Sequence, residues 1–273
     1  MADVLDKIKT VDPMKGEKAT KVQSMPGLIR VGIGGWTFEP WRGVFYPAGL
    51  THKRELEFAS RALTSIEING TYYSTLKPAS WKKWRDETPD DFVFAVKASR
   101  YCTNRKVLGQ AGEAIDRFVS QGLTELGQKL GPINWQFMAT KKFEPEDFAT
   151  FLALLPKEKD GIALRHAVEV RHLSFATEAF YELARLHGVA IVCAKDDDDE
   201  PFPEIDEPTA GFTYARLMSS SEDEETGVSN EELSGIAKRV KLWAKRGDVF
   251  AYFIAGAKVR NPAAARALIE KVR

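Results

Sequence analysis

The sequence alternates between short apolar segments and longer segments with helical periodicity, and this alternation constrains the fold more than any other feature. Eight segments of roughly six residues are rich in apolar and β-branched side chains, as expected for buried strands. They are 29–35, 65–69, 92–98, 132–138, 166–171, 189–195, 211–217 and 248–254. The stretches with helical spacing are 53–62, 79–87, 113–130, 145–155, 177–187, 231–246 and 262–272. Strands that alternate with helices predict a parallel sheet, and eight such units predict a single (β/α)8 barrel of the TIM type.

Two segments do not fit this repeat. Residues 1–25 are rich in lysine and contain Pro13 and Gly16, so we expect a mobile N-terminal tail followed by one barrel domain over 26–273. Residues 196–210 are rich in Asp, Glu and Pro, which predicts a long loop in place of a helix between the sixth and seventh strands.

The composition excludes several classes of protein. The chain has 39 basic and 39 acidic residues, so no overall charge attracts it to nucleic acid or to a membrane. Cys102 and Cys193 lie far apart and outside any zinc-ligand spacing, which favours reduced thiols in a cytoplasmic protein. No apolar stretch has the length of a membrane-spanning helix, so we expect no membrane partner.

Charged residues recur at or near the ends of the predicted strands. An apolar strand has no structural use for a charge at its end, since burying an unpaired charge costs several kcal/mol. Repetition over several strands therefore predicts one shared polar site. The residues are Glu67, Lys97, Glu169, Arg171, Lys195 and Arg216.

The alternation of side chains along a strand tests this idea. Glu67 and Asn69 share one face of their strand, and the apolar Ile66 and Ile68 share the other. The same rule predicts that the other charged residues point into the barrel. It groups Lys97 with Ala95, Gln136 with Asn134, Glu169 and Arg171 with Ala167, Lys195 with Cys193 and Ile191, and Arg216 with Tyr214. Barrel enzymes keep their chemistry at the C-terminal ends of the strands, which is where these residues fall.

At this point the sequence also resembles a known family. From about Leu28 to the C-terminus it is similar to the YecE-like family, domain of unknown function 72, whose members fold as barrels. The resemblance implies a barrel and a set of matched positions, and it implies no reaction. The matched residues are Gly35-Trp36, Trp41, Gly43, Phe45-Tyr46-Pro47, Glu67-Ile68-Asn69, Thr71-Tyr72-Tyr73, Phe94-Ala95-Val96-Lys97, Glu169, Arg171-His172 and Tyr214-Ala215-Arg216.

The later strands depart from the family pattern. Met138-Ala139-Thr140 replaces a Pro-Pro step, Leu217-Met218-Ser219 replaces a His-Gly step, and Phe253-Ile254-Ala255 replaces an Asn-rich strand end. These positions lie where a barrel selects its substrate, so the resemblance does not carry a substrate to this chain.

The charged set suggests catalysis on an anionic substrate. Glu67 and Glu169 lie on the second and fifth strands, nearly opposite each other in an eight-stranded ring, where two carboxylates can act as acid and base or as acid and nucleophile. Each could equally be paired with a lysine or arginine inside the barrel. Four cations against two carboxylates favour a phosphate, phosphodiester or carboxylate ligand, with Lys97, Arg171 and Arg216 as its clamp.

Other residues add to the candidate site. His172 is the one histidine placed where a base could act, although a structural or capping role is the alternative. Trp36 and Tyr72 belong to an aromatic rim that could stack on a sugar or a base, or could form a small core of its own. We thus expect Glu67, Glu169, Lys97 and His172 to be catalytic. The expected substrate-binding residues are Trp36, Asn69, Tyr72, Gln136, Arg171, Lys195 and Arg216.

The sequence predicts no cofactor. Gly32, Gly34 and Gly35 do not form a dinucleotide loop, because Thr37 takes the place of the third glycine. A divalent ion at Asp196–Glu200 is less expected than a solvated loop. The leading hypothesis is a cytoplasmic hydrolase or lyase acting on a small, anionic, phosphorylated or sugar-containing substrate. The alternative is a non-catalytic binder of an anionic metabolite or of nucleic acid, the latter disfavoured by the neutral net charge.

Overall fold

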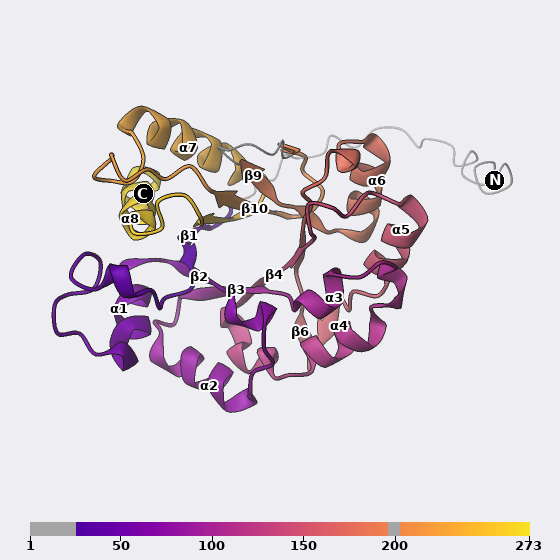
Figure 1. Cartoon of the computed structure of the whole chain (residues 1–273), viewed down its shortest axis with the longest axis horizontal. Helices are drawn as coiled ribbons and strands as arrows, with labels where there is room; N and C mark the ends of the chain where they lie inside the picture. The colour runs from indigo at the N-terminus through magenta and orange to yellow at the C-terminus, as the bar shows by residue number, and fades with distance from the viewer. Residues whose placement is uncertain (1–25, 196–202) are drawn as a thin grey trace, which may run out of the picture.

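The computed structural model describes residues 26–195 and 203–273, apart from the side chain of Lys195. At its centre is a parallel sheet with the strand order β8-β7-β4-β3-β2-β1-β11-β10-β9, and Figure 1 shows the helices around it. The strands are β1 (Ile29–Gly34), β2 (Ser65–Ile68), β3 (Val93–Lys97), β4 (Leu130–Gln136), β7 (His166–Glu169), β8 (Ala190–Ile191), β9 (Cys193–Lys195), β10 (Phe212–Leu217) and β11 (Asp248–Phe253).

The sheet nearly closes on itself, because its two edge strands belong to one segment of the chain. β8 pairs with β7 and β9 pairs with β10, and Val192 alone separates β8 from β9. The backbone N–H of Val192 donates to the carbonyl of Val168 at 3.0 Å, which extends the pairing with β7. The β8–β9 segment therefore occupies the place of the sixth strand, and the predicted TIM-type barrel is confirmed.

Helices follow the strands and cover the outside of the barrel (Figure 1). Their packing buries the apolar side of each helix against the sheet, which is why the helical periodicity was visible in the sequence. They are α1 (Glu55–Ala62), α2 (Pro78–Glu87), α3 (Arg100–Thr103), α4 (Gly112–Val119), α5 (Pro145–Ala153), α6 (Glu178–His187), α7 (Asn230–Trp243) and α8 (Asn261–Val272). None of the helices described here is long and apolar enough to cross a membrane.

The predicted helix over 113–130 is wrong in its second half. α4 ends at Val119, and the chain then turns at Gly122 into a 3-10 segment, Leu123–Lys129. Gly122 has a φ of +102°, and a Cβ there would lie 2.9 Å from the Cα of Pro78 at the start of α2. Close approach of α2 thus selects glycine and a left-handed turn at this position, which helical periodicity could not reveal.

The strands divide their side chains between two apolar clusters. Ile66 and Ile68 pack in the outer cluster between the sheet and the helices, whereas Ala95 and Ala167 pack in the inner cluster within the barrel. This agrees with the predicted faces of β2, β3 and β7. The charged residues at the ends of these strands therefore lie on the inner side.

The predicted faces of the sixth strand are reversed. Ile191 and Cys193 belong to the outer cluster, and Ala190, Val192 and Ala194 to the inner one. Every residue from 189 to 194 is apolar, so the sequence gives no polar position that distinguishes the faces. The barrel interior takes Ala190, Val192 and Ala194, and Ile191 and Cys193 pack outward.

Two features of the connections bear on the predictions. Residues 203–210 form neither helix nor strand, in agreement with the expected loop, whereas 196–202 and the expected tail over 1–25 lie outside the described residues. A short antiparallel hairpin, β5 (Glu158–Lys159) and β6 (Ile162–Ala163), was not predicted. Its turn residues Asp160 and Gly161 both have positive φ, as is typical of the Asp-Gly turn.

Candidate functional site

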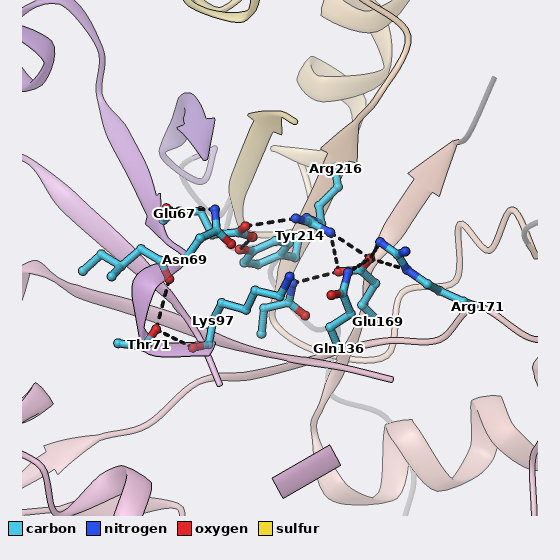
Figure 2. Close-up of polar contacts among 11 residues, drawn as sticks. Glu67, Asn69, Thr71, Lys97, Gln136, Glu169, Arg171, Tyr214 and Arg216 are labelled. Carbon is cyan, nitrogen blue, oxygen red and sulfur yellow. Dashed lines mark hydrogen bonds and ion pairs between the residues drawn. The ribbon is translucent and has the colours of Figure 1, made fainter. Parts of the chain in front are cut away.

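Arg216 occupies the centre of the barrel and contacts both predicted glutamates. Its Nη1 lies 2.8 Å from each carboxylate oxygen of Glu169, and its Nη2 lies 3.2 Å from Oε1 of Glu67. All three side chains are almost fully buried. Figure 2 shows the guanidinium between the two carboxylates, so that strands β2, β7 and β10 are joined by one network of charges.

Glu67 has a second buried partner. The hydroxyl of Tyr214 donates to its Oε2, and Tyr214 lies two residues before Arg216 on the same inner face of β10. Burial raises the pKa of Tyr214 well above its ordinary value, and the negative charge of Glu67 raises it further. Tyr214 therefore stays protonated and acts as a hydrogen-bond donor to this carboxylate.

Glu169 accepts hydrogen bonds from four side chains. Besides Arg216, its oxygens accept from Asn134 at 3.0 Å, from Gln136 at 2.6 Å, and from Nη2 of Arg171 at 2.7 Å. Burial would raise the pKa of Glu169, but Arg216, Arg171 and the two amides outweigh it and hold the pKa well below its usual range. A carboxylate stabilised in this way stays ionised near neutral pH and is poorly suited to carry a proton.

A pocket of about 790 Å³ opens beside this network. Arg216 and Lys97 form part of its inner wall, and the loops after β1, β2 and β11 form its sides. Glu67 and Glu169 are not among its lining residues, whereas Arg216, which contacts both, is one of them. The remaining lining includes Trp36, Leu56, Trp84, Ile254 and the cations Lys53, Lys83 and Lys258.

Lys97 is the half-buried cation of the pocket. Its Nζ lies 4.5 Å from the centre of the Tyr72 ring, and within the described residues it forms no hydrogen bond and no ion pair. Burial lowers the pKa of Lys97, Arg216 lowers it further, and Glu67 and Glu169 act in the opposite direction. Its backbone is fixed by Thr71, whose hydroxyl donates to the Lys97 carbonyl at 2.6 Å.

The structure brings most of the predicted site together. Asn69, Trp36, Lys97 and Arg216 line the pocket, whereas Gln136 and Arg171 act on Glu169 behind it. The Oδ1 atom of Asn69 is buried without a hydrogen-bond partner in the described part of the chain.

Three predicted residues lie elsewhere or cannot be placed. Tyr72 does not line the pocket, but supports Lys97 and accepts a hydrogen bond from Asn104 at 3.3 Å. His172 also lies outside it: its Nδ1 accepts from the Ser174 backbone at 3.1 Å and caps the 3-10 turn Leu173–Phe175. Lys195 lies in β9, and its side chain is outside the described part of the structure.

Sequence reasoning missed several groups of the site. Tyr214 shares a face with Arg216, so strand alternation placed it inside the barrel but did not give its bond to Glu67. Lys258 follows β11, and its Nζ lies 4.2 Å from the centre of the Phe38 ring. Trp84 lies in α2, and Lys53 lies in the 3-10 turn His52–Arg54 directly before α1. No local pattern marks these residues, because only the packing of the helices brings them to the pocket.

The donor set does not resemble a metal centre. In residues 26–195 and 203–273, no three His, Cys, Asp or Glu side chains are grouped so that they could hold a metal ion. The acidic run Asp196–Glu200, where a divalent ion was less expected than a solvated loop, lies within 196–202, outside the described residues.

The nearly closed parallel sheet, with its polar network at the C-terminal ends of the strands, defines a (β/α)8 barrel protein with a pocket at the usual place for barrel chemistry. The family profile described as "Protein of unknown function DUF72" matches residues 30–273. The chain belongs to this family.

Relatives agree with this assignment. The chain is similar to the UPF0759 protein YecE of Escherichia coli K12, with 28% identity over 151 residues, which are 54% of this chain and 50% of that protein. The match thus spans about half the length of this curated relative. A crystal structure of a DUF72 family protein from Thermotoga maritima has 28% identity and a TM-score of 0.72, and the match covers 89% of this chain and 98% of that one. One from Enterococcus faecalis V583, with 16% identity and a TM-score of 0.69 over 90% and 95% of the two chains, shows the same fold.

Proposed function

We propose that this protein is an enzyme of the hydrolase or lyase class that binds a small organic anion in the pocket beside Arg216. One observation carries the proposal. Three ammonium groups, those of Lys53, Lys97 and Lys258, line the pocket and have no carboxylate partner among the residues that the structure describes. Lys83 differs, since it lies 3.6 Å from Glu87. Cations gathered in a concave site attract an anion more strongly than the same charges spread over a surface.

The dimensions and walls of the pocket support the same ligand class. Its volume of about 790 Å³ falls within the range of small-molecule sites. Trp36 and Trp84 contribute apolar wall, with their rings in edge contact at 4.9 Å between centres. A phosphorylated or carboxylated compound with a ring or sugar body would place its charge near the lysines and its body against the tryptophans.

The proposal gives the charged residues different roles. Glu169 and Glu67 hold Arg216 in place, because both are buried behind it and Glu169 is held ionised. Proton transfer is assigned to Lys97, whose lowered pKa brings it closer to neutral pH than an ordinary lysine. The pair of glutamates is thus a support for the anion site in this proposal and not the acid and base.

Thermal unfolding in inorganic phosphate tests the anion site. At ten times its dissociation constant, phosphate should stabilise the wild-type protein by about 1.4 kcal/mol. Lys97→Met should lose most of this gain, and the matched control Lys82→Met should keep it, because Lys82 is exposed and does not line the pocket. An equal gain in both variants, or no gain in the wild type, would overturn the anion site.

The enzyme half of the proposal has its own test. Compounds that compete with phosphate can be incubated with the protein and examined by mass spectrometry, and at least one should be converted by the wild type. A set of tight-binding anions that are all returned unchanged would leave a binding protein, the alternative function for the same pocket.

A second candidate function rests on a separate observation. Tyr73 and Tyr101 are 67% and 61% exposed, and the Arg100 guanidinium carbon lies 5.7 and 5.5 Å from their ring centres. Exposed aromatic rings beside a cation are typical of surfaces on which single-stranded bases stack. Binding of a fluorescent oligonucleotide, weakened by Tyr73→Ala with Tyr101→Ala and by added salt, would support this function. No binding at low salt would reject it.

A further inference from the structure

Lys97 differs from Arg171 and Arg216 in what its charged group contacts. Arg216 donates to Glu67 and Glu169, and Arg171 donates to Glu169. Nζ of Lys97 is left with the face of the Tyr72 ring, 4.5 Å from its centre. An aromatic face stabilises an ammonium group but occupies none of its three hydrogen-bond directions. The amine is therefore half-buried, faces a pocket, and is not held by any carboxylate of the described chain.

The carboxylates that could neutralise Lys97 are already bonded to other side chains. Glu169 accepts from four side chains, and Glu67 accepts from Arg216 and Tyr214. The charged groups that act on Lys97 are Arg216, Arg171, Glu67 and Glu169. Burial and the two arginines lower the pKa of Lys97, and they outweigh the two carboxylates, which raise it. A larger share of the amine is then unprotonated near neutral pH than for an exposed lysine, and the unprotonated amine is the nucleophilic form.

We propose that Lys97 forms an imine with the carbonyl carbon of a small anionic aldehyde or ketone bound in the pocket. The inference rests on the proposed anion site and names its substrate class: a 2-oxo acid or a phosphorylated carbonyl compound. Both share a carbonyl group next to or near an anion. Lys53 and Lys258 are the unpaired cations that would hold the anionic group while the carbonyl meets Nζ of Lys97.

The reaction balances without a co-reactant. The lone pair of the neutral amine adds to the carbonyl carbon, the π electrons of the carbonyl move to oxygen, and a proton passes from nitrogen to that oxygen. The resulting carbinolamine loses its hydroxyl group as water once the hydroxyl is protonated, and the nitrogen lone pair forms the carbon–nitrogen double bond. Asn69 lines the same pocket, and its buried Oδ1 has no hydrogen-bond partner in the described part of the chain, so a small rotation of the amide would let it accept a hydrogen bond from the carbinolamine hydroxyl. The protonated imine can then withdraw electrons from a neighbouring carbon–carbon or carbon–hydrogen bond, which is the chemistry of a lyase.

Reductive trapping tests this inference with defined probes. The protein is incubated with glyoxylate or glycolaldehyde phosphate and sodium cyanoborohydride, which reduces an imine to a stable secondary amine. Peptide mapping should locate the adduct on Lys97, formed about tenfold or more faster than on exposed lysines, because bound reactants meet at high effective concentration. Excess inorganic phosphate should slow trapping at Lys97 and leave the exposed lysines unaffected. The two probes separate carboxylate from phosphate recognition.

Variants separate the nucleophile from the positive charge. Lys97→Arg keeps the charge but cannot form an imine, so it should retain stabilisation by phosphate and lose the adduct. The control Lys82→Met removes an exposed lysine that does not line the pocket, and should keep the adduct on Lys97. Trapping spread evenly over all lysines, with a phosphate effect that still depends on Lys97, would overturn the imine and leave the anion site standing. Loss of both signals in the wild type would overturn both.

Discussion

Nη1 of Arg216 lies 2.8 Å from both carboxylate oxygens of Glu169, and both side chains are almost fully buried. Two buried carboxylates, Glu67 and Glu169, depend on this one guanidinium for much of their compensation. This arrangement decides which charge faces the pocket, because Arg216 lines the pocket and Glu67 and Glu169 do not.

Arg216→Met should destabilise the protein by about 3–5 kcal/mol, because it leaves two buried carboxylates without their shared partner. Urea unfolding followed by circular dichroism measures the loss. The control Arg273→Met breaks an exposed pair with Glu270 at 2.9 Å and should have a much smaller effect. Adding Glu67→Gln and Glu169→Gln to Arg216→Met should recover part of the stability. A fully stable Arg216→Met protein would contradict the account of the network.

His166 should make stability depend on pH between about 6.5 and 4. Burial lowers the pKa of His166 to about 4, whereas an unfolded histidine has a pKa of about 6.5. Nδ1 accepts from Trp135 at 3.1 Å and Nε2 contacts the Pro156 carbonyl at 2.7 Å, so the neutral ring is satisfied and a second proton has no acceptor. As pH falls through this window, the unfolded state binds a proton that the folded state does not bind. Up to about 3 kcal/mol of stability is therefore lost.

Substitution of the histidine and of its donor checks this pH dependence. His166→Gln should flatten the curve of unfolding free energy against pH over that window, whatever its overall stability. Trp135→Phe removes the donor to Nδ1, which allows His166 to take up a proton, and should reduce the slope. If both variants retain the wild-type slope, another group is responsible.

Lys129 should contribute to stability by capping the C-terminal end of α2. Its buried Nζ donates to the carbonyls of Arg85 at 2.6 Å and Thr88 at 2.7 Å, in the last turn of the helix and just after it. A cation at the C-terminal end of a helix also interacts favourably with the helix dipole. Lys129→Met should therefore cost about 1–3 kcal/mol in chemical unfolding. The exposed Lys82→Met on the same helix is the control, and a similar loss in both would contradict the specific role of Lys129.

Phosphate affinity should fall as sodium chloride is raised, because the unpaired cations of the pocket also attract chloride and their field is screened. Lys258→Met should weaken phosphate binding and make it less sensitive to salt. Isothermal titration at several salt concentrations gives both quantities. An affinity independent of salt would mean that the lysines do not contact the anion.

Local patterns in the sequence were sufficient for the barrel and for much of its inner face. The spacing of the apolar segments gave the strands, and the alternation of Glu67 with Ile66 and Ile68 gave the correct face because polar and apolar residues differ at every step. The same rule failed for 189–194, where all residues are apolar and no polar position distinguishes the two faces. Helical periodicity likewise failed to predict where α4 ends, since the turn at Gly122 depends on contact with Pro78.

The sequence by itself indicated that charged residues of several strands would gather at the C-terminal ends of the strands, because a parallel barrel brings those ends to one face. Only the tertiary structure decided how the charges are shared. Glu67 and Glu169 became partners of Arg216 behind the pocket wall, and Lys97 was left facing the pocket with an aromatic ring as its neighbour. Pairing depends on distances of a few ångströms between side chains far apart in the chain, and these distances follow from the closure and packing of the whole barrel.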